Sequence, residues 1–210
     1  MIVGVMGRKR AGKDCAAAPL LRCGYVQVNF ADRVREMALA IDPLVRAQSS
    51  VVWLSDAVRI MGWTKAKEEP DVRRLLQRIG TEGGRDILGA DVWVGLWRKR
   101  VDDWLPGTRV VATDVRFSNE AAEIRSRGGI IVRIDNPRLP DDDAHASEQA
   151  MAAIEPDAVV VNDLDICDLQ AEFVHVVGEL QRQRGGRWLP GLSGAELLRM
   201  RGDLPAGVPA

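Results

Sequence analysis

The residues best suited to chemistry form the segment GRKRAGKDC at 7–15. Its glycines and lysine have the spacing G-x-x-x-x-G-K, in which backbone N–H groups surround phosphate oxygens and the lysine reaches the outer phosphates. The apolar run at 2–6 precedes the segment and a helix-forming stretch follows it, which is the context that such a loop requires. The alternative is a glycine turn between a strand and a helix, with the lysine in solvent. The residues predicted to bind a nucleotide are Gly7, Arg8, Lys9, Arg10, Ala11, Gly12, Lys13, Asp14 and Cys15.

Three cations lie inside this loop, Arg8, Lys9 and Arg10. They repel one another unless an anion lies between them, so they either point to solvent or contact a transferring phosphoryl group. Positive charge stabilises the transition state of such a transfer. We favour the contact for Arg10 or Lys9. The predicted catalytic residues are Lys13, Arg10 and Asp114.

Many such loops place a hydroxyl after the lysine, whereas this chain has Asp14 and then Cys15. A carboxylate holds Mg²⁺ directly or through water. A thiol is a soft ligand, so Cys15 suits packing or a weak phosphate contact better than metal binding. Asp114 ends the apolar run at 109–113 and is the better candidate for the water shell of the metal, although an aspartate there also suits a turn or a helix cap. The sequence thus predicts a Mg²⁺ site at Asp114 and Asp14.

The elements that must position these residues alternate along the chain. Strands are predicted at 2–6, 25–30, 109–114, 130–134 and 158–162, and helices at 12–22, 32–41, 51–61, 71–80, 90–104, 118–127 and 165–184. This order predicts an α/β fold with a mostly parallel five-stranded sheet. Ligands of such sheets bind at the carboxyl ends of the strands, where the glycine loop, Asp32 and Asp114 fall. Pro19 predicts a kink or an early end in the first helix.

Length and composition limit the remaining choices. The 210 residues suit one domain with an inserted lobe, which we place at 42–104, and a loose tail at 185–210. Acidic and basic residues number 30 and 29, so the chain has almost no net charge. It therefore has no overall positive field that would attract a nucleic-acid polymer. Three cysteines without disulfide or metal spacing favour a reducing compartment, here the cytoplasm. No apolar run predicts a signal peptide or a membrane span.

These motifs together resemble the bacteriophage-type deoxynucleoside monophosphate kinases. The loop GRKRAGKD is similar to the loop of that family. Later segments resemble it in the same order: FADRVREMA at 30–38, GWTKAK at 62–67, VRRLLQRIGTEGGRDILGADVWV at 72–94, TDVRFSNEAAEIRSRGG at 113–129 and HASE at 145–148. The resemblance implies a three-layer P-loop kinase domain at 1–184, with a lobe over the acceptor and a lid at about 135–150. It also implies transfer of the γ-phosphoryl group of ATP to a deoxynucleoside monophosphate, with Mg²⁺.

The resemblance further implies where the substrates bind. Gly7 to Lys13 would hold the donor phosphates, while the acceptor would contact Arg35, Arg74, Gln77, Thr81, Arg85 and Arg116. Asp32, which follows the second predicted strand, is a further candidate for substrate binding. The alternative for any single one of these arginines is that it is a solvent-exposed surface charge. Cys15 and Pro19 depart from the pattern, since the family usually has threonine at position 15.

Other readings stay open. One of the tryptophans in or beside the lobe could stack on a base; these are Trp53, Trp63, Trp93 and Trp97. Phosphomevalonate kinases of the animal type carry a similar loop, so the acceptor could be another small phosphorylated molecule. A nucleotide-binding module without catalysis is the third reading, favoured by Cys15 and opposed by Lys13, Asp114 and Arg116. A homodimer is compatible with the sequence, and neither nucleic acid nor a membrane is expected as a partner.

Overall fold

The structure is a computed structural model that describes residues 1–104, 107–139, 150–163 and 165–185. The chain divides into two compact units, one of Met1–Asn29 with Val101–Ala210 and one of Phe30–Arg100. The predicted tail after residue 185, the HASE motif and most of the predicted lid at 135–150 lie outside the described residues. Within the described ranges, no helix combines the length and apolar character needed to cross a membrane.

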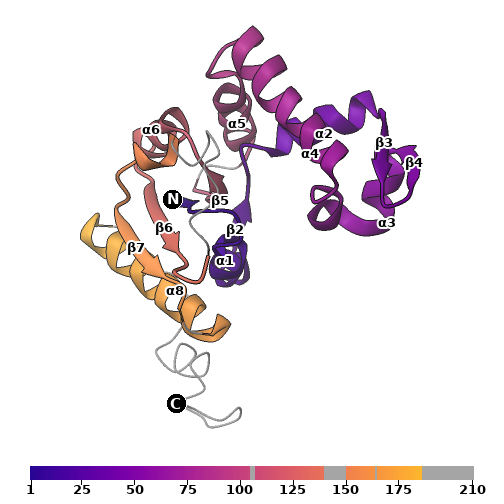
Figure 1. The fold of residues 1–210 in the computed structure, drawn as a ribbon. Coiled ribbons are helices and arrows are strands. Elements are labelled where there is room, and N and C mark those ends of the chain that lie inside the picture. The colour runs from indigo at the N-terminus through magenta and orange to yellow at the C-terminus, as the bar shows by residue number, and fades with distance from the viewer. Residues whose placement is uncertain (105–106, 140–149, 164, 186–210) are drawn as a thin grey trace. The chain divides into compact units, whose positions relative to one another are not determined.

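The first unit is built on a five-stranded sheet (Figure 1). Its strand order is β2-β5-β1-β6-β7, and all neighbouring strands are parallel. The strands are β1 (Ile2–Met6), β2 (Tyr25–Gln27), β5 (Arg109–Val115), β6 (Ile130–Asp135) and β7 (Ala158–Val161). Every residue of β1 is buried, as expected for a strand covered on both faces. The predicted α/β fold with a parallel five-stranded sheet is therefore confirmed, although the strand predicted at 25–30 ends at Gln27.

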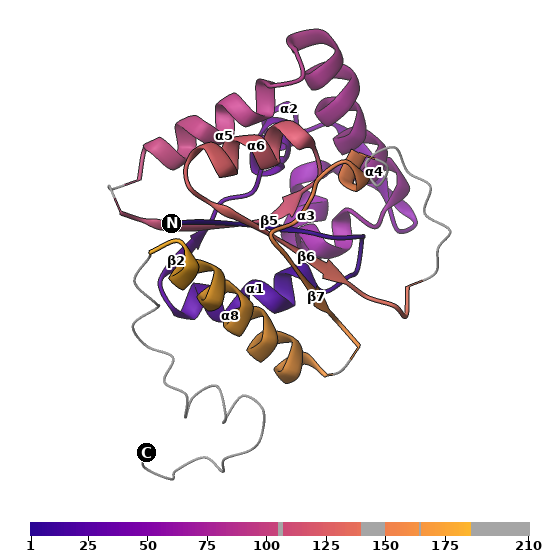
Figure 2. The same ribbon diagram turned by 90° about the vertical axis from the view of Figure 1, so that its left-hand side faces the viewer.

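Helices cover both faces of this sheet, which makes three layers. Helices α1 (Lys13–Arg22) and α8 (Ile166–Gln183) lie side by side on one face, and α6 (Ser118–Ser126) lies on the other (Figure 2). The largest buried side chains under α1 and α8 are Val3, Val5, Leu20, Ile130, Ile134 and Phe173. On the α6 side, Ile124 packs so closely that a Cβ on Gly4 would lie 2.7 Å from its Cδ1.

The early end predicted at Pro19 is wrong, because α1 stays helical from Lys13 to Arg22. Proline lacks the N–H that would bond to the carbonyl four residues back, which belongs to Cys15. The side-chain amide of Gln170 in α8 donates to that carbonyl at 3.0 Å. The neighbouring helix thus supplies the hydrogen bond that the proline removes.

The second unit is helical with a small hairpin. Its elements are α2 (Asp32–Ile41), β3 (Leu44–Ala47), β4 (Ser50–Trp53), α3 (Leu54–Ala66), α4 (Pro70–Gln77), the π-helix η1 (Arg78–Leu88) and most of α5 (Val92–Asp102). A core of buried residues joins them: Ala38, Val45, Ala47, Leu54, Ala57 and Val72. The helix predicted at 51–61 is wrong at its start, since Val51 and Val52 pair with β3 in the antiparallel hairpin. The helix predicted at 71–80 is α-helical only to Gln77.

Candidate active site

The glycine loop connects β1 to α1 through residues with positive φ. The φ angles are 145° at Gly7, 66° at Arg10 and 98° at Gly12. A Cβ on Gly7 would lie 2.4 Å from the carbonyl oxygen of Ile134, and one on Gly12 would lie 2.6 Å from Nδ2 of Asn162. Both positions therefore require glycine, for their backbone conformation and for the close approach of neighbouring segments.

Asn162, which directly follows β7, holds the loop in place. Its Nδ2 donates to the carbonyl of Ala11 at 2.9 Å, and its backbone N–H donates to the carbonyl of Asp135 at 2.7 Å. Inside the loop, the N–H of Ala11 donates to the carbonyl of Arg8 at 3.1 Å. Asn162 was not predicted as a site residue. Its position directly after an apolar run of valines was the one signal for it.

Lys13 lies against the backbone of the loop that precedes it. Its Nζ donates to the carbonyls of Gly7 at 2.8 Å and Arg8 at 2.7 Å. The ammonium group is thereby placed beside the N-terminus of α1, whose N–H groups add a positive partial charge. Together these groups suit a phosphate. Of the other loop cations, Arg8 and Lys9 are half-buried and Arg10 is exposed.

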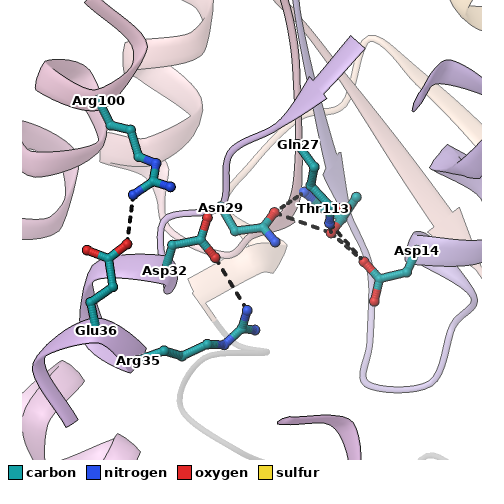
Figure 3. Close-up of polar contacts among 8 residues, drawn as sticks. All are labelled: Asp14, Gln27, Asn29, Asp32, Arg35, Glu36, Arg100 and Thr113. Carbon is teal, nitrogen blue, oxygen red and sulfur yellow. Dashed lines mark hydrogen bonds and ion pairs between the residues drawn. The ribbon is translucent and has the colours of Figure 1, made fainter. Parts of the chain in front are cut away.

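A chain of hydrogen bonds joins the ends of two strands to the first turn of α1 (Figure 3). Nε2 of Gln27, the last residue of β2, donates to the hydroxyl of Thr113 in β5 at 2.9 Å. That hydroxyl donates to Oδ1 of Asp14 at 2.5 Å, and the backbone N–H of Thr113 donates to Oδ1 of Asn29 at 2.9 Å. The carboxylate of Asp14 therefore has a fixed orientation at the carboxyl edge of the sheet.

Asp14 and Asp114 are the predicted metal ligands, and Asp114 follows Thr113 in β5. Over the described ranges, no group of three or more His, Cys, Asp or Glu side chains is arranged to hold a metal ion. Mg²⁺ is usually held by one or two carboxylates together with substrate phosphates and water. The carboxylate oxygens of Asp14 and Asp114 fit this hard cation in kind, whereas the thiol of Cys15 does not.

Arg116 lies in the turn between β5 and α6, and its side chain is exposed. The backbone N–H groups of Arg116 and Phe117 both donate to Oε2 of Glu120, at 2.8 and 3.2 Å. Glu120 is buried in the first turn of α6. This acid, which the sequence analysis did not single out, fixes the backbone that carries the predicted acceptor residue.

The other predicted acceptor residues belong to the second unit, where α2 packs against α4 and η1. Arg35 of α2 is half-buried and pairs with Asp32 at 3.3 Å (Figure 3). Arg74 of α4 pairs with Asp71 at 3.1 Å. In η1 and the segment after it, Nη1 of Arg85 donates to the carbonyl of Ala90 at 2.9 Å. Gln77 and Thr81 are exposed.

A second ion pair of this unit involves Glu36, whose Oε1 lies 2.7 Å from Arg100 (Figure 3). Partial burial opposes ionisation of the Glu36 carboxyl, but Arg33 and Arg100 outweigh that effect and lower its pKa. The carboxylate is 46% exposed, so solvent screening keeps its contribution to stability small.

Two of the tryptophans proposed for base stacking are engaged in packing. Trp97 is buried and stacks on Phe30, with ring centroids 4.7 Å apart. Nε1 of Trp93 donates to the carbonyl of Gly80 at 2.7 Å, and its ring packs on Gly84 of η1. The two contacts of Trp93 secure the π-helix against α5. They leave Trp53, which is 52% exposed, as the most accessible of the four.

A cavity of about 570 Å³ adjoins the glycine loop within the first unit. It lies beside the starts of α1 and α8. Its lining residues are Gly12, Cys15, Asn136, Arg138, Asn162, Asp165, Ile166, Cys167 and Leu169. The size and the mixture of apolar and amide side chains are those of a small-molecule site. None of the residues on the α8 side was predicted from the sequence.

A parallel sheet whose first strand leads through G-x-x-x-x-G-K into a helix defines the P-loop class of α/β proteins. Residues 48–173 match the family described as deoxynucleotide monophosphate kinase. A protein of Acanthamoeba polyphaga mimivirus named "Putative deoxynucleotide monophosphate kinase" is 33% identical over 197 residues, which cover 84% of this chain and 96% of that protein. The chain therefore belongs to the deoxynucleotide monophosphate kinase family, and the resemblance drawn from its motifs is confirmed.

Among solved structures, the dephospho-CoA kinase from Campylobacter jejuni matches with a TM-score of 0.43 and 14% sequence identity. The match covers 87% of this chain and 98% of that chain. A likeness this distant carries no conclusion about activity. Family membership favours neither of the two alternatives, the phosphomevalonate kinase or the non-catalytic module.

Proposed function

We propose that this chain transfers the γ-phosphoryl group of ATP to a deoxynucleoside 5′-monophosphate, giving the diphosphate and ADP. The observation that carries the proposal is the position of Lys13, whose ammonium group lies against the carbonyls of Gly7 and Arg8 at the N-terminus of α1. In a member of this family, such a positive site serves the phosphates of the donor. The transfer needs positioning and positive charge, and no protein nucleophile.

The donor occupies two parts of the first unit in this proposal. Its phosphates contact the backbone N–H groups of Gly7 to Lys13. Its base and ribose enter the cavity beside Gly12, where the amides of Asn136 and Asn162 offer hydrogen bonds. Arg8, Lys9 and Arg10 surround the phosphates with positive charge, and Arg10 or Lys9 contacts the transferring group.

Asp14 and Asp114 would hold Mg²⁺, which when bound neutralises charge on the β- and γ-phosphates. Thr113 and Gln27 orient the carboxylate of Asp14 for this role. Asp14 is exposed, so its remaining oxygen lone pairs are accessible to the ion or to its water shell.

The acceptor would bind mainly to the second unit, where arginine suits a phosphate because its guanidinium group contacts two oxygens at once. The residues assigned to it are Asp32, Arg35, Arg74, Gln77, Thr81 and Arg85, together with Arg116 of the first unit. Arg35 is half-buried and oriented by Asp32, whereas Arg74 is exposed.

The test is a rate assay with ATP and Mg²⁺ in which dTMP, dGMP, dCMP, dAMP, their ribo forms and phosphomevalonate are offered separately. ADP and the new diphosphate are quantified together. We expect turnover of at least one deoxynucleotide, and a loss of about 100-fold or more in Lys13→Ala, since the lysine stabilises charge in the transition state. Lys99→Ala, an exposed lysine of α5 outside the segments that resemble the family, is the matched control and should leave the rate unchanged.

Two results would overturn the proposal. Turnover of phosphomevalonate alone would assign a different acceptor. ATP binding without turnover of any acceptor would assign a module without catalysis.

A further inference from the structure

We propose that Cys15 and Cys167 make the cavity beside the glycine loop a site of reversible thiol modification, at which a small disulfide compound forms an adduct that excludes the nucleotide. The inference rests on the proposed function, because that function assigns the base and ribose of ATP to this cavity. It adds a second class of ligand, a low-molecular-weight disulfide such as oxidised glutathione.

The two thiols reach the cavity from two different helices. Cys15 lies in the first turn of α1, Cys167 lies in the first turn of α8, and both are exposed and reduced. Both contribute to the wall of the cavity. An adduct on either sulfur therefore enters the same space.

Direct contact between α1 and α8 holds the first turns of the two helices together. Gln170 lies one turn after Cys167 along α8, and its amide donates to the backbone carbonyl of Cys15 at 3.0 Å. Residues three apart on a helix are neighbours on its surface. Cys167 is thus presented on the part of α8 that contacts the backbone of Cys15.

The wall of the cavity also suits an acidic thiol compound. Arg138 supplies a cation, and the amides of Asn136 and Asn162 supply hydrogen-bond donors. Asp165 is the one acidic residue among those that line the cavity, and its Oδ1 accepts from the backbone N–H of Asp168 at 2.9 Å. The carboxylates of glutathione would find positive charge at Arg138.

The third cysteine provides a control within the chain. Cys23 lies at the C-terminal end of α1, is half-buried and packs against the core of the first unit. It is not among the residues that line the cavity. Modification of Cys23 would therefore leave the nucleotide site open.

The exchange needs no reagent besides the disulfide. The cysteine sulfur attacks one sulfur of the compound, a new protein–sulfur bond forms, the original S–S bond breaks, and the leaving thiolate takes up the proton of the cysteine. If the second cysteine then attacks the adduct, a protein disulfide forms and the second thiol leaves. In either outcome dithiothreitol reverses the modification.

The experiment uses the full chain, treated with oxidised glutathione and compared with untreated protein. Peptide mapping by mass spectrometry locates the modified cysteines, and calorimetric titration measures the affinity for ATP. We expect modification at Cys15 and Cys167, slower modification in the presence of ATP, and an affinity for ATP that falls by about tenfold or more and returns with dithiothreitol.

Serine variants separate the sites. Cys15→Ser/Cys167→Ser should have the same affinity for ATP before and after treatment, whatever that affinity is, whereas Cys23→Ser should remain as sensitive as the original chain. The inference is overturned if Cys15 and Cys167 are fully modified while ATP binds as before. It is equally overturned if the double variant stays sensitive. Untreated protein that neither binds ATP nor turns over any acceptor would instead contradict the proposed function, so the two failures are distinct.

Discussion

The hydroxyl of Thr113 donates a hydrogen bond of 2.5 Å to the carboxylate of Asp14, which ties the end of β5 to the first turn of α1. Nε2 of Gln27 donates to the same hydroxyl at 2.9 Å. The residue that we assign to Mg²⁺ is thus oriented by two neutral side chains from neighbouring strands. Neither of them needs to touch a substrate to influence the reaction.

Thr113→Val keeps the shape of this buried side chain and removes its hydroxyl. A hydrogen bond to a charged group contributes roughly 1.5–3 kcal/mol, so we expect kcat to fall by about tenfold or more and the Mg²⁺ concentration for half-maximal rate to rise. Thr113→Ser restores the hydroxyl and should restore both values. Equal rates in the valine and serine variants would show that the bond to Asp14 does not position the metal ligand.

Gly7→Ala should disable the loop, because the added Cβ would lie 2.4 Å from the carbonyl oxygen of Ile134. Gly24→Ala is the matched control. Gly24 also has a positive φ, but nothing lies within 4 Å of its added Cβ. Backbone strain of about 1–3 kcal/mol should destabilise both variants in urea unfolding, while only Gly7→Ala should lose affinity for ATP. Loss of affinity in both variants would assign the effect to backbone strain alone.

Gln170→Ala should destabilise the chain by about 0.5–1.5 kcal/mol, since it leaves the carbonyl of Cys15 without its donor. In a Pro19→Ala background the new N–H at position 19 supplies that bond, so the cost of Gln170→Ala should shrink. Urea unfolding of the four proteins in this double-mutant cycle measures the difference. An identical cost in both backgrounds would show that Gln170 does not compensate for the proline.

Arg35→Ala should raise the KM for the deoxynucleotide by about tenfold or more and leave the KM for ATP unchanged, because we assign Arg35 to the acceptor alone. Arg59→Ala is the control. Both arginines pair with an aspartate three residues earlier in the same unit, but the Arg35 side chain is 29% exposed and that of Arg59 is 72% exposed. Steady-state rates over a grid of both substrates provide the two constants. A parallel change in both would place Arg35 outside the acceptor site.

Much of the sheet could be predicted because its three central strands, β1, β5 and β6, are buried on both faces and are therefore continuous apolar runs. The strands predicted at 2–6, 109–114, 130–134 and 158–162 all exist with small changes at their ends. The order of the strands in the sheet could not be read from these runs, since parallel pairing depends on distant segments.

The second unit was harder to predict for identifiable reasons. The hairpin of β3 and β4 has only four residues in each strand, and its turn at Gln48 has a φ of 54° without the glycine or asparagine that usually marks such a turn. The apolar spacing at 72, 75, 76 and 79 indicates a helix but does not distinguish an α-helix from the π-helix that begins at Arg78.

At the site, the glycine loop and Lys13 could be predicted because one short segment carries the whole pattern. The partners that hold this segment could not, since Thr113 lies 99 positions from Asp14 and Asn162 lies 151 positions from Ala11. Asn162, Gln170 and Thr113 are ordinary polar residues in the sequence. Only the fold brings them to the loop.

The bond from Asn162 to the carbonyl of Ala11 has a consequence for the order of events during translation. The glycine loop leaves the ribosome long before β6 and Asn162, the segments that give it its shape. A nascent chain that ends before residue 162 therefore lacks the side chain that bonds to the carbonyl of Ala11 in the loop. We therefore expect stabilisation by a bound nucleotide to be greatest in chains whose synthesis has passed Asn162.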